Sequence, residues 1–209
     1  MTTRQRIGLR KPPVKMRAPG RKRRQALIDA AYALLCERDV DDVSFRDVAT
    51  QAGVPEGSAY HFFANRFDLF SAVADSLSDK FIEAHRAPIP AAKRASWTDL
   101  ANHLVEVGAD VYAANPPARQ LLIGGKTPPE VKQADRRNDR AVAAAMHASF
   151  SRYFDLPDSD QMRDAFYYFI EITDLIFTLS IIEHGKITAP MLAEAKRAGV
   201  AYLNTFRSQ

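Results

Sequence analysis

Hydrogen-bond donors and a cation gather in the stretch between Ser44 and Arg66, SFRDVATQAGVPEGSAYHFFANR. Ser58, Tyr60 and His61 offer a hydroxyl, a phenol and an imidazole on what reads as a short helix with little apolar surface. Donors of this kind suit the base edges in the major groove of DNA. Arg66 lies in the first turn of the next expected helix, where a cation opposes the helix dipole. A phosphate group is therefore its expected partner.

Local signals predict the elements that position these groups. Ser44 and the acid three residues later have the spacing of a capping box, so a helix is expected to begin at Phe45. Gly53 can end that helix because glycine adopts a positive φ without strain. Pro55 suits the first turn of a second, short helix, and Asn65 can cap a third. The stretch therefore predicts a helix-turn-helix followed directly by a longer helix.

The same residues resemble a known family. The run Ala49-x-x-x-Gly53-Val54-x-x-Gly57-Ser58-x-Tyr60-x-x-Phe63-x-Asn65-Arg66-x-x-Leu69 is similar to the DNA-binding signature of the tetracycline-repressor (TetR) family of bacterial regulators, over about residues 23–77. The resemblance implies base and backbone contacts from the first helix, groove reading by the second and a phosphate anchor at the third. The expected DNA-binding residues are Arg23, Arg24, Ser44, Arg46, Pro55, Glu56, Gly57, Ser58, Tyr60, His61 and Arg66.

Four positions depart from the family pattern, namely Glu56, Ala59, Phe62 and Phe67. They affect the expected operator sequence more than the fold. A carboxylate at Glu56 repels phosphate and can accept from cytosine N4, which makes it a candidate specificity residue. The alternative is an acid at a helix start that simply faces solvent.

Positive charge is concentrated at the N-terminus. The formal net charge is +4, yet residues 1–24 hold ten Arg or Lys and no acid, so the remainder has a net charge of −6. Residues 1–21 contain prolines, a glycine and few apolar groups, which predicts a disordered basic arm. Such an arm can lie along phosphates or enter a minor groove. The alternative is a tail that only increases solubility.

The remaining composition predicts a soluble, cytoplasmic protein. The single cysteine, Cys36, cannot form an intramolecular disulfide, and its place on an apolar helical face suggests a small core residue. The basic N-terminus is not followed by the continuous apolar segment of a signal peptide. The most apolar run, residues 165–182, contains Glu171 and Asp174, which disfavours a membrane span.

Helical periodicity continues to the C-terminus, and no credible strand is found, so the expected fold class is all-α with about nine helices. Three parts are expected: a basic arm (1–21), a helix-turn-helix DNA-binding domain with a connecting helix (22–86), and a helical effector-binding and dimerisation domain (87–209). The expected helices span residues 22–38, 45–52, 55–63, 66–86, 97–114, 118–123, 128–154, 160–184 and 188–206.

The helix expected at residues 160–184 is apolar on nearly every side, so it must be buried on more than one face. A second copy of the chain is the simplest cover for its outer face, through a twofold interface of four helices. The resemblance implies the same homodimer. Two reading heads would then meet successive major grooves roughly 34 Å apart on a palindromic operator. The expected dimer contacts are Phe169, Ile172, Ile176, Leu179, Leu192 and Leu203.

Glu171 and Asp174 are the polar exceptions on that helix. They can line an effector pocket that attracts a cationic or hydroxylated molecule, form ion pairs with basic side chains across the dimer, or face solvent. Aromatic content marks further pocket candidates, although the same spacing suits a core. The expected ligand-binding residues are His103, Tyr112, His147, Phe150, Tyr153, Tyr167, Glu171 and Asp174.

Three functions follow from these patterns. The first is a dimeric transcriptional regulator, a repressor released from a palindromic DNA operator by a small-molecule effector. The second is a constitutive or architectural DNA-binding protein with no effector. The third is an enzyme, but no catalytic, metal-ligand or phosphate-loop constellation in the sequence favours it. We therefore expect no enzymatic activity, no metal and no cofactor.

Overall fold

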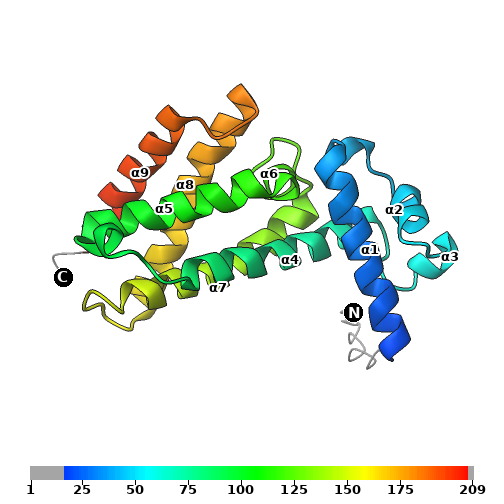
Figure 1. Ribbon diagram of the computed structural model, residues 1–209, viewed down its shortest axis with the longest axis horizontal. Coiled ribbons are helices and arrows are strands. Elements are labelled where there is room, and N and C mark those ends of the chain that lie inside the picture. Colours follow the sequence, from blue (N-terminus) through cyan, green and yellow to red (C-terminus); the bar gives the residue numbers. More distant parts are fainter. Residues whose placement is uncertain (1–16, 207–209) are drawn as a thin grey trace, which may run out of the picture.

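The computed structural model describes residues 17–206, and all regular secondary structure in that range is helical (Figure 1). Nine α-helices and two 3-10 turns follow one another along the described chain. The predicted all-α fold class is confirmed. In Figure 1, α1 to α3 form a group at one end of the molecule, α5 to α9 fill the other end, and α4 runs between them.

The first group, called the head below, contains α1 (Ala18–Glu37), the turn η1 (Val40–Asp42), α2 (Phe45–Gln51) and α3 (Glu56–Ala59). Helix α1 begins four residues before the predicted start, because Pro19 sits in its first turn, where a missing N–H costs nothing. Residues 18–21 are therefore helical and not part of a disordered arm. Residues 1–16 of that arm lie outside the described part of the chain.

Helix α4 (Arg66–Arg86) connects the two ends. Asn65 caps it, since its side-chain oxygen accepts from the backbone N–H groups of Phe67 at 2.8 Å and Asp68 at 3.0 Å. Its apolar residues are buried on one side by α1 and on another by α7, with which it makes its most extensive packing. A displacement of α4 would therefore be felt in both groups.

The second group, called the C-terminal domain below, begins with the turn η2 (Ala91–Arg94). It continues with α5 (Trp97–Ala114), α6 (Pro116–Leu121), α7 (Pro129–Phe150), α8 (Asp160–His184) and α9 (Ala189–Asn204). Helix α7 ends four residues earlier than predicted, in a turn that carries Tyr153 and Phe154. Gly185, with φ of 69°, ends α8 in the left-handed conformation that favours glycine.

Helix α8 is enclosed by α7 and α9 but keeps one open apolar face. Phe169 and Leu203, predicted as dimer contacts, have no exposed surface, so that prediction is wrong for both. The reason is the close α8–α9 approach: a Cβ at Gly199 would lie 2.6 Å from the Phe169 ring. Ile172, Ile176 and Leu192 are half-buried, and Leu179 is exposed.

Cys36 lies on the solvent side of α1 near its end and is exposed, which corrects the prediction of a core residue. The buried apolar residues of α1 are instead Leu27, Ile28, Ala30, Ala31, Leu34 and Leu35. Partial burial and the nearby Glu37 carboxylate raise the pKa of the Cys36 thiol, so the geometry gives no sign of an activated thiolate.

Candidate functional site

The first half of the candidate DNA-reading surface is held by a capping box. The Asp47 backbone N–H donates to Ser44 Oγ at 3.1 Å, and the Ser44 backbone N–H donates to the Asp47 carboxylate at 3.1 Å. Ser44 Oγ also donates to that carboxylate at 2.6 Å. These hydrogen bonds lower the pKa of Asp47. The cap fixes where α2 begins and leaves Arg46 exposed in its first turn.

The turn between α2 and α3 follows the sequence prediction. Gly53 has φ of 61°, and Val54 is buried beneath the corner. Pro55 is the N-cap residue of α3 and not part of its first turn. Regular helix covers only Glu56–Ala59, but hydrogen bonds continue to Phe63, whose N–H donates to the Ala59 carbonyl at 3.2 Å.

The outer side of α3 and its following turn carries the predicted groove-reading groups. Tyr60 is 51% exposed, and its ring packs on Phe45 with centroids 4.6 Å apart, so the phenol is both accessible and supported from below. His61, Glu56 and Gly57 are exposed, while Ser58 is half-buried. These groups form one continuous polar surface of the kind that a major groove admits.

Three predicted cations flank that surface. Arg23 lies with Lys22 beside the turn at residues 52–55, on the rim of a surface groove. The Arg24 guanidinium lies 5.0 Å from the Phe63 ring centroid and is half-buried. Arg24 therefore packs within the head in addition to any contact with DNA. Arg66 stacks on Phe67 at 4.9 Å, and its Nη1 lies 3.5 Å from the Asp41 carbonyl.

A cavity lies inside the C-terminal domain, between α4, α5, α7 and α8. Its volume is about 30 Å³, room for about two water molecules. Ala74, Ser78, Phe81 and His85 line it from a single face of α4. The helix that emerges from the head therefore forms one wall of the cavity.

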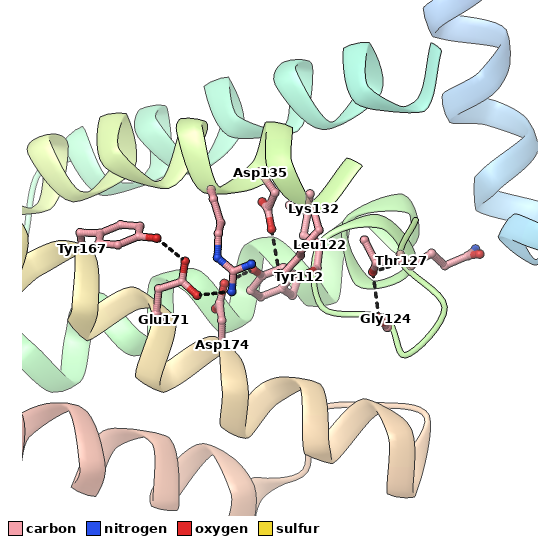
Figure 2. A network of polar contacts seen from close by, with 11 residues as sticks. Tyr112, Leu122, Gly124, Thr127, Lys132, Asp135, Tyr167, Glu171 and Asp174 are labelled. Carbon is pink, nitrogen blue, oxygen red and sulfur yellow. Dashed lines mark hydrogen bonds and ion pairs between the residues drawn. The ribbon is translucent and has the colours of Figure 1, made fainter. Parts of the chain in front are cut away.

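Carboxylates line the opposite walls. Asp135 and Asp139 come from α7 and Asp174 from α8, as the close-up in Figure 2 shows for Asp135 and Asp174. The Tyr112 hydroxyl donates to Asp174 at 2.7 Å, and Lys132 Nζ lies 3.0 Å from Asp135. Burial raises the pKa of Asp174 to about 7. Burial, together with repulsion from Asp135 and Asp174, raises the pKa of Asp139 to about 9.

Two predicted ligand-binding residues, Tyr112 and Asp174, line this cavity. Glu171 lies just outside it, where Tyr167 donates to it at 2.8 Å and Arg136 pairs with it at 3.1 Å (Figure 2). Neither Glu171 nor Tyr167 lines the cavity. Glu171 forms its ion pair with α7 of the same chain, in place of a pair across a dimer.

The other predicted pocket residues also lie away from the cavity. Phe150 is fully buried in an aromatic cluster with Trp97 and Phe166, so it is a core residue. His147 packs edge-on against Phe166, Tyr153 lies beneath the Arg94 guanidinium, and His103 lies near Glu106 on α5. Phe150 and His147 are turned toward Phe166 of α8, while Tyr153 and His103 contact residues close to α5 and η2.

Sequence reasoning missed Asp135 and Asp139, because residues 130–140 read as a polar, solvated stretch. A usable signal was present: Val131, Asp135, Asn138 and Val142 recur with helical spacing, and the two valines are buried. An acid that interrupts an apolar stripe is a candidate for burial.

A polar bridge links the cavity wall to the head. Lys132 Nζ donates to the Leu122 carbonyl at 2.7 Å, and Leu122 itself lines the cavity (Figure 2). Two residues earlier, Gln120 Nε2 donates to the carbonyls of Leu35 at 2.8 Å and Arg38 at 2.9 Å. Its Oε1 accepts from the Val40 N–H at 2.6 Å. The end of α1 is thus fastened to α6 by one side chain.

The segment after α6 adds an ion pair to the same junction. Lys126 Nζ lies 3.0 Å from Asp41 and 3.4 Å from Asp39, which places it against η1 of the head. Within residues 17–206, no group of three or more His, Cys, Asp or Glu side chains has an arrangement suited to a metal ion. Helix α8 is long and apolar enough to cross a membrane, but packing inside a domain accounts for the same composition.

A compact head with a capped helix-turn-helix, joined by α4 to a helical domain with an internal cavity, defines the class of helix-turn-helix DNA-binding regulators. The family described as "Bacterial regulatory proteins, tetR family" matches residues 27–73, and the family described as "Tetracyclin repressor-like, C-terminal domain" matches residues 95–206. The chain belongs to the TetR family of transcriptional regulators, which bind DNA and are not enzymes.

Solved structures share this fold at low sequence identity. A TetR-family transcriptional regulator from Streptomyces coelicolor has a TM-score of 0.68 at 20% identity, over 88% of this chain and 99% of that one. A TetR transcriptional regulator from Rhodococcus sp. RHA1 has a TM-score of 0.69 at 18% identity, over 88% of this chain and 96% of that one. The multidrug binding protein EbrR, complexed with imidazole, has a TM-score of 0.61 at 20% identity, over 86% of this chain and 94% of that one. No curated protein matches the chain.

Proposed function

We propose that the protein is a homodimeric, cytoplasmic repressor that a small-molecule effector releases from a palindromic operator. The observation that carries this proposal is the course of α4. Arg66 starts this helix beside the reading surface, and Ser78 and His85, further along it, line the cavity. An effector that binds better when α4 is displaced lowers the affinity of the head for DNA, since binding shifts the equilibrium by that difference.

The open face of α8 supports the dimer. Tyr168, Leu175, Leu179 and Ile182 are 44–61% exposed and recur at spacings of seven, four and three residues, so they share one face. Exposed apolar stripes of this length mark association surfaces. A dimer with twofold symmetry would present two heads, as a palindromic duplex site requires.

Within the head, we assign base reading to Arg46, Ser58, Tyr60 and His61, and phosphate contact to Arg66. Arg23 and the basic residues before it extend the positively charged surface toward the neighbouring backbone. Glu56 is exposed at the start of α3, in a position to accept from cytosine.

The test begins with selection of bound duplexes from a random pool by the full-length protein. We expect a palindromic site that binds two protomers, at least 10³-fold more tightly than unrelated DNA. Leu179→Glu should give a monomer in sedimentation and lose most of that affinity, whereas the matched surface variant Ala91→Glu should not. Recovery of no sequence preference, or binding of one protomer per site, would overturn the proposal.

A further inference from the structure

The cavity combines an apolar lining with an excess of negative charge. Phe81, Phe169 and Phe177 contribute aromatic surface from α4 and α8. The Tyr112 ring lies 4.8 Å from Phe81 and 6.0 Å from Phe177, centroid to centroid. Aromatic faces attract cations as well as apolar groups.

Within the described part of the chain, only one of the three cavity acids pairs with a cation. Lys132 pairs with Asp135, whereas Asp174 accepts only a hydrogen bond from the Tyr112 phenol. Asp139 takes part in no hydrogen bond or ion pair among the described residues, although the two neighbouring carboxylates repel it. Asp139 is half-buried, and a carboxylate withdrawn from water without a partner is unfavourable. A cation in the cavity would supply that partner.

A second polar group in the cavity also lacks a partner. Ser78 on α4 is 8% exposed and lines the cavity, and its hydroxyl takes part in none of the hydrogen bonds found between residues 17 and 206. Buried hydroxyls are normally hydrogen-bonded. An unpaired hydroxyl and an unpaired carboxylate, one on α4 and one on α7, therefore line the same space.

We propose that this cavity binds an organic ammonium ion, with its charged nitrogen between Asp139, Asp174 and Ser78 and its apolar body against the aromatic lining. This inference rests on the proposed function and names the chemical class of its effector. An ammonium group supplies the missing positive charge and donates to both carboxylates and the hydroxyl. A neutral ligand would supply no positive charge to Asp139 and Asp174, and an inorganic cation would leave the aromatic surface unused.

The size of the cavity connects binding to DNA release. A ligand with an apolar body of eight carbons exceeds the space of about 30 Å³, so helices must separate to admit it. Ser78 and Phe81 belong to α4, and Asp139 belongs to α7, its most extensive packing partner. Opening the cavity therefore moves the helix that carries Arg66.

Binding should be linked to proton release. Asp139, with a pKa of about 9, holds a proton at neutral pH that an ammonium ion must displace. The affinity should therefore rise from pH 6 to pH 9, by at most about tenfold per pH unit for each proton released. The other titratable groups that line this space are Asp135 on α7, Asp174 on α8, Tyr112 on α5 and His85 on α4. Lys132 and Arg136 on α7 and Glu171 on α8 lie just outside it.

Calorimetric titration of the full-length protein tests the proposal with octylammonium, octan-1-ol and octanoate, which share one chain and differ in charge. We expect octylammonium to bind at least tenfold more tightly than the other two at pH 8. Asp139→Asn should remove about tenfold or more of that affinity, and Ser78→Ala a smaller factor. The matched variant Glu130→Gln, an exposed acid on the same helix, should bind as the wild type does.

Four outcomes would overturn the proposal. They are equal binding of octan-1-ol, preference for octanoate, tight binding of Mg²⁺ or Ca²⁺ that depends on Asp139, and no binding of octylammonium. Asp139→Asn replaces a carboxyl group without a partner by a neutral amide of the same shape, so the variant is expected to fold. Failure here is distinguishable from failure of the proposed function, because duplex selection without any ligand tests DNA binding separately.

Discussion

The head and the C-terminal domain place their polar groups differently. In the head, Ser44 and Asn65 satisfy helix ends by local hydrogen bonds, and Tyr60 and His61 face outward. In the C-terminal domain, acids from α7 and α8 converge on an interior cavity. A surface that binds a large charged partner needs exposed hydrogen-bond donors. A pocket for a small partner needs enclosed polar groups whose missing hydrogen bonds or charges the partner supplies.

The largest expected effect concerns the head. Arg66→Ala should weaken operator binding by about ten- to a hundredfold, because each protomer loses one phosphate contact, and should make the salt dependence less steep. Fluorescence anisotropy at several salt concentrations measures both quantities. Arg152→Ala removes the same charge from an exposed turn of the C-terminal domain and should change neither. Equal losses from both variants would mean that only overall charge matters.

In the C-terminal domain, Asp139→Asn should raise the free energy of unfolding at pH 8 by about 1–3 kcal/mol, because a half-buried acid without a partner is removed. The folded pKa of about 9 lies above the unfolded value, so the folded state holds a proton that the unfolded chain has lost. Wild-type stability should therefore fall relative to the variant as the pH rises from 6 to 9. Denaturant unfolding at each pH measures the difference, and a constant difference would contradict the assignment.

The junction between the two regions should show an intermediate effect. Gln120→Ala removes three hydrogen bonds that fasten α6 to α1 and η1, with an expected cost of about 1–3 kcal/mol. The variant should also respond less to ligand, because the head is less firmly attached to the cavity wall. Gln133→Ala, an exposed glutamine on α7, is the control. Unchanged stability and unchanged ligand response would exclude the bridge as a coupling element.

The smallest effect is expected at Glu106, which bridges Lys93 of η2 at 2.7 Å and Lys196 of α9 at 2.6 Å. Burial opposes ionisation, but these two partners outweigh it and lower the pKa of Glu106 to about 2. Its contribution is therefore present above about pH 4.5 and lost as the pH falls toward 2. Glu106→Gln should cost about 1–2 kcal/mol at pH 7 and much less at pH 2, with Glu83→Gln as the exposed control. A loss that is as large at pH 2 as at pH 7 would indicate a packing effect.

The same contrast explains what the sequence could predict. Ser44, Gly53 and Asn65 act through hydrogen bonds or backbone angles within a few residues, so the caps and the turn of the head were predictable from the sequence. Whether Phe169 and Leu203 are buried within the chain or exposed to a partner depended on how closely α9 approaches α8 at Gly199. The positions of Asp135 and Asp139 beside the cavity depended on how α4 and α8 pack against α7. Such placements follow from tertiary packing, which spacing along one helix does not determine.

If α4 couples the two regions, filling the acidic cavity must lower the affinity of the head for DNA. The direct measurement is operator affinity at pH 8 as octylammonium is added, for the wild type and for Asp139→Asn. We predict that the wild type loses at least tenfold in affinity while the variant loses little. Unchanged operator affinity of a wild-type protein that has demonstrably bound the ammonium ion would contradict this coupling.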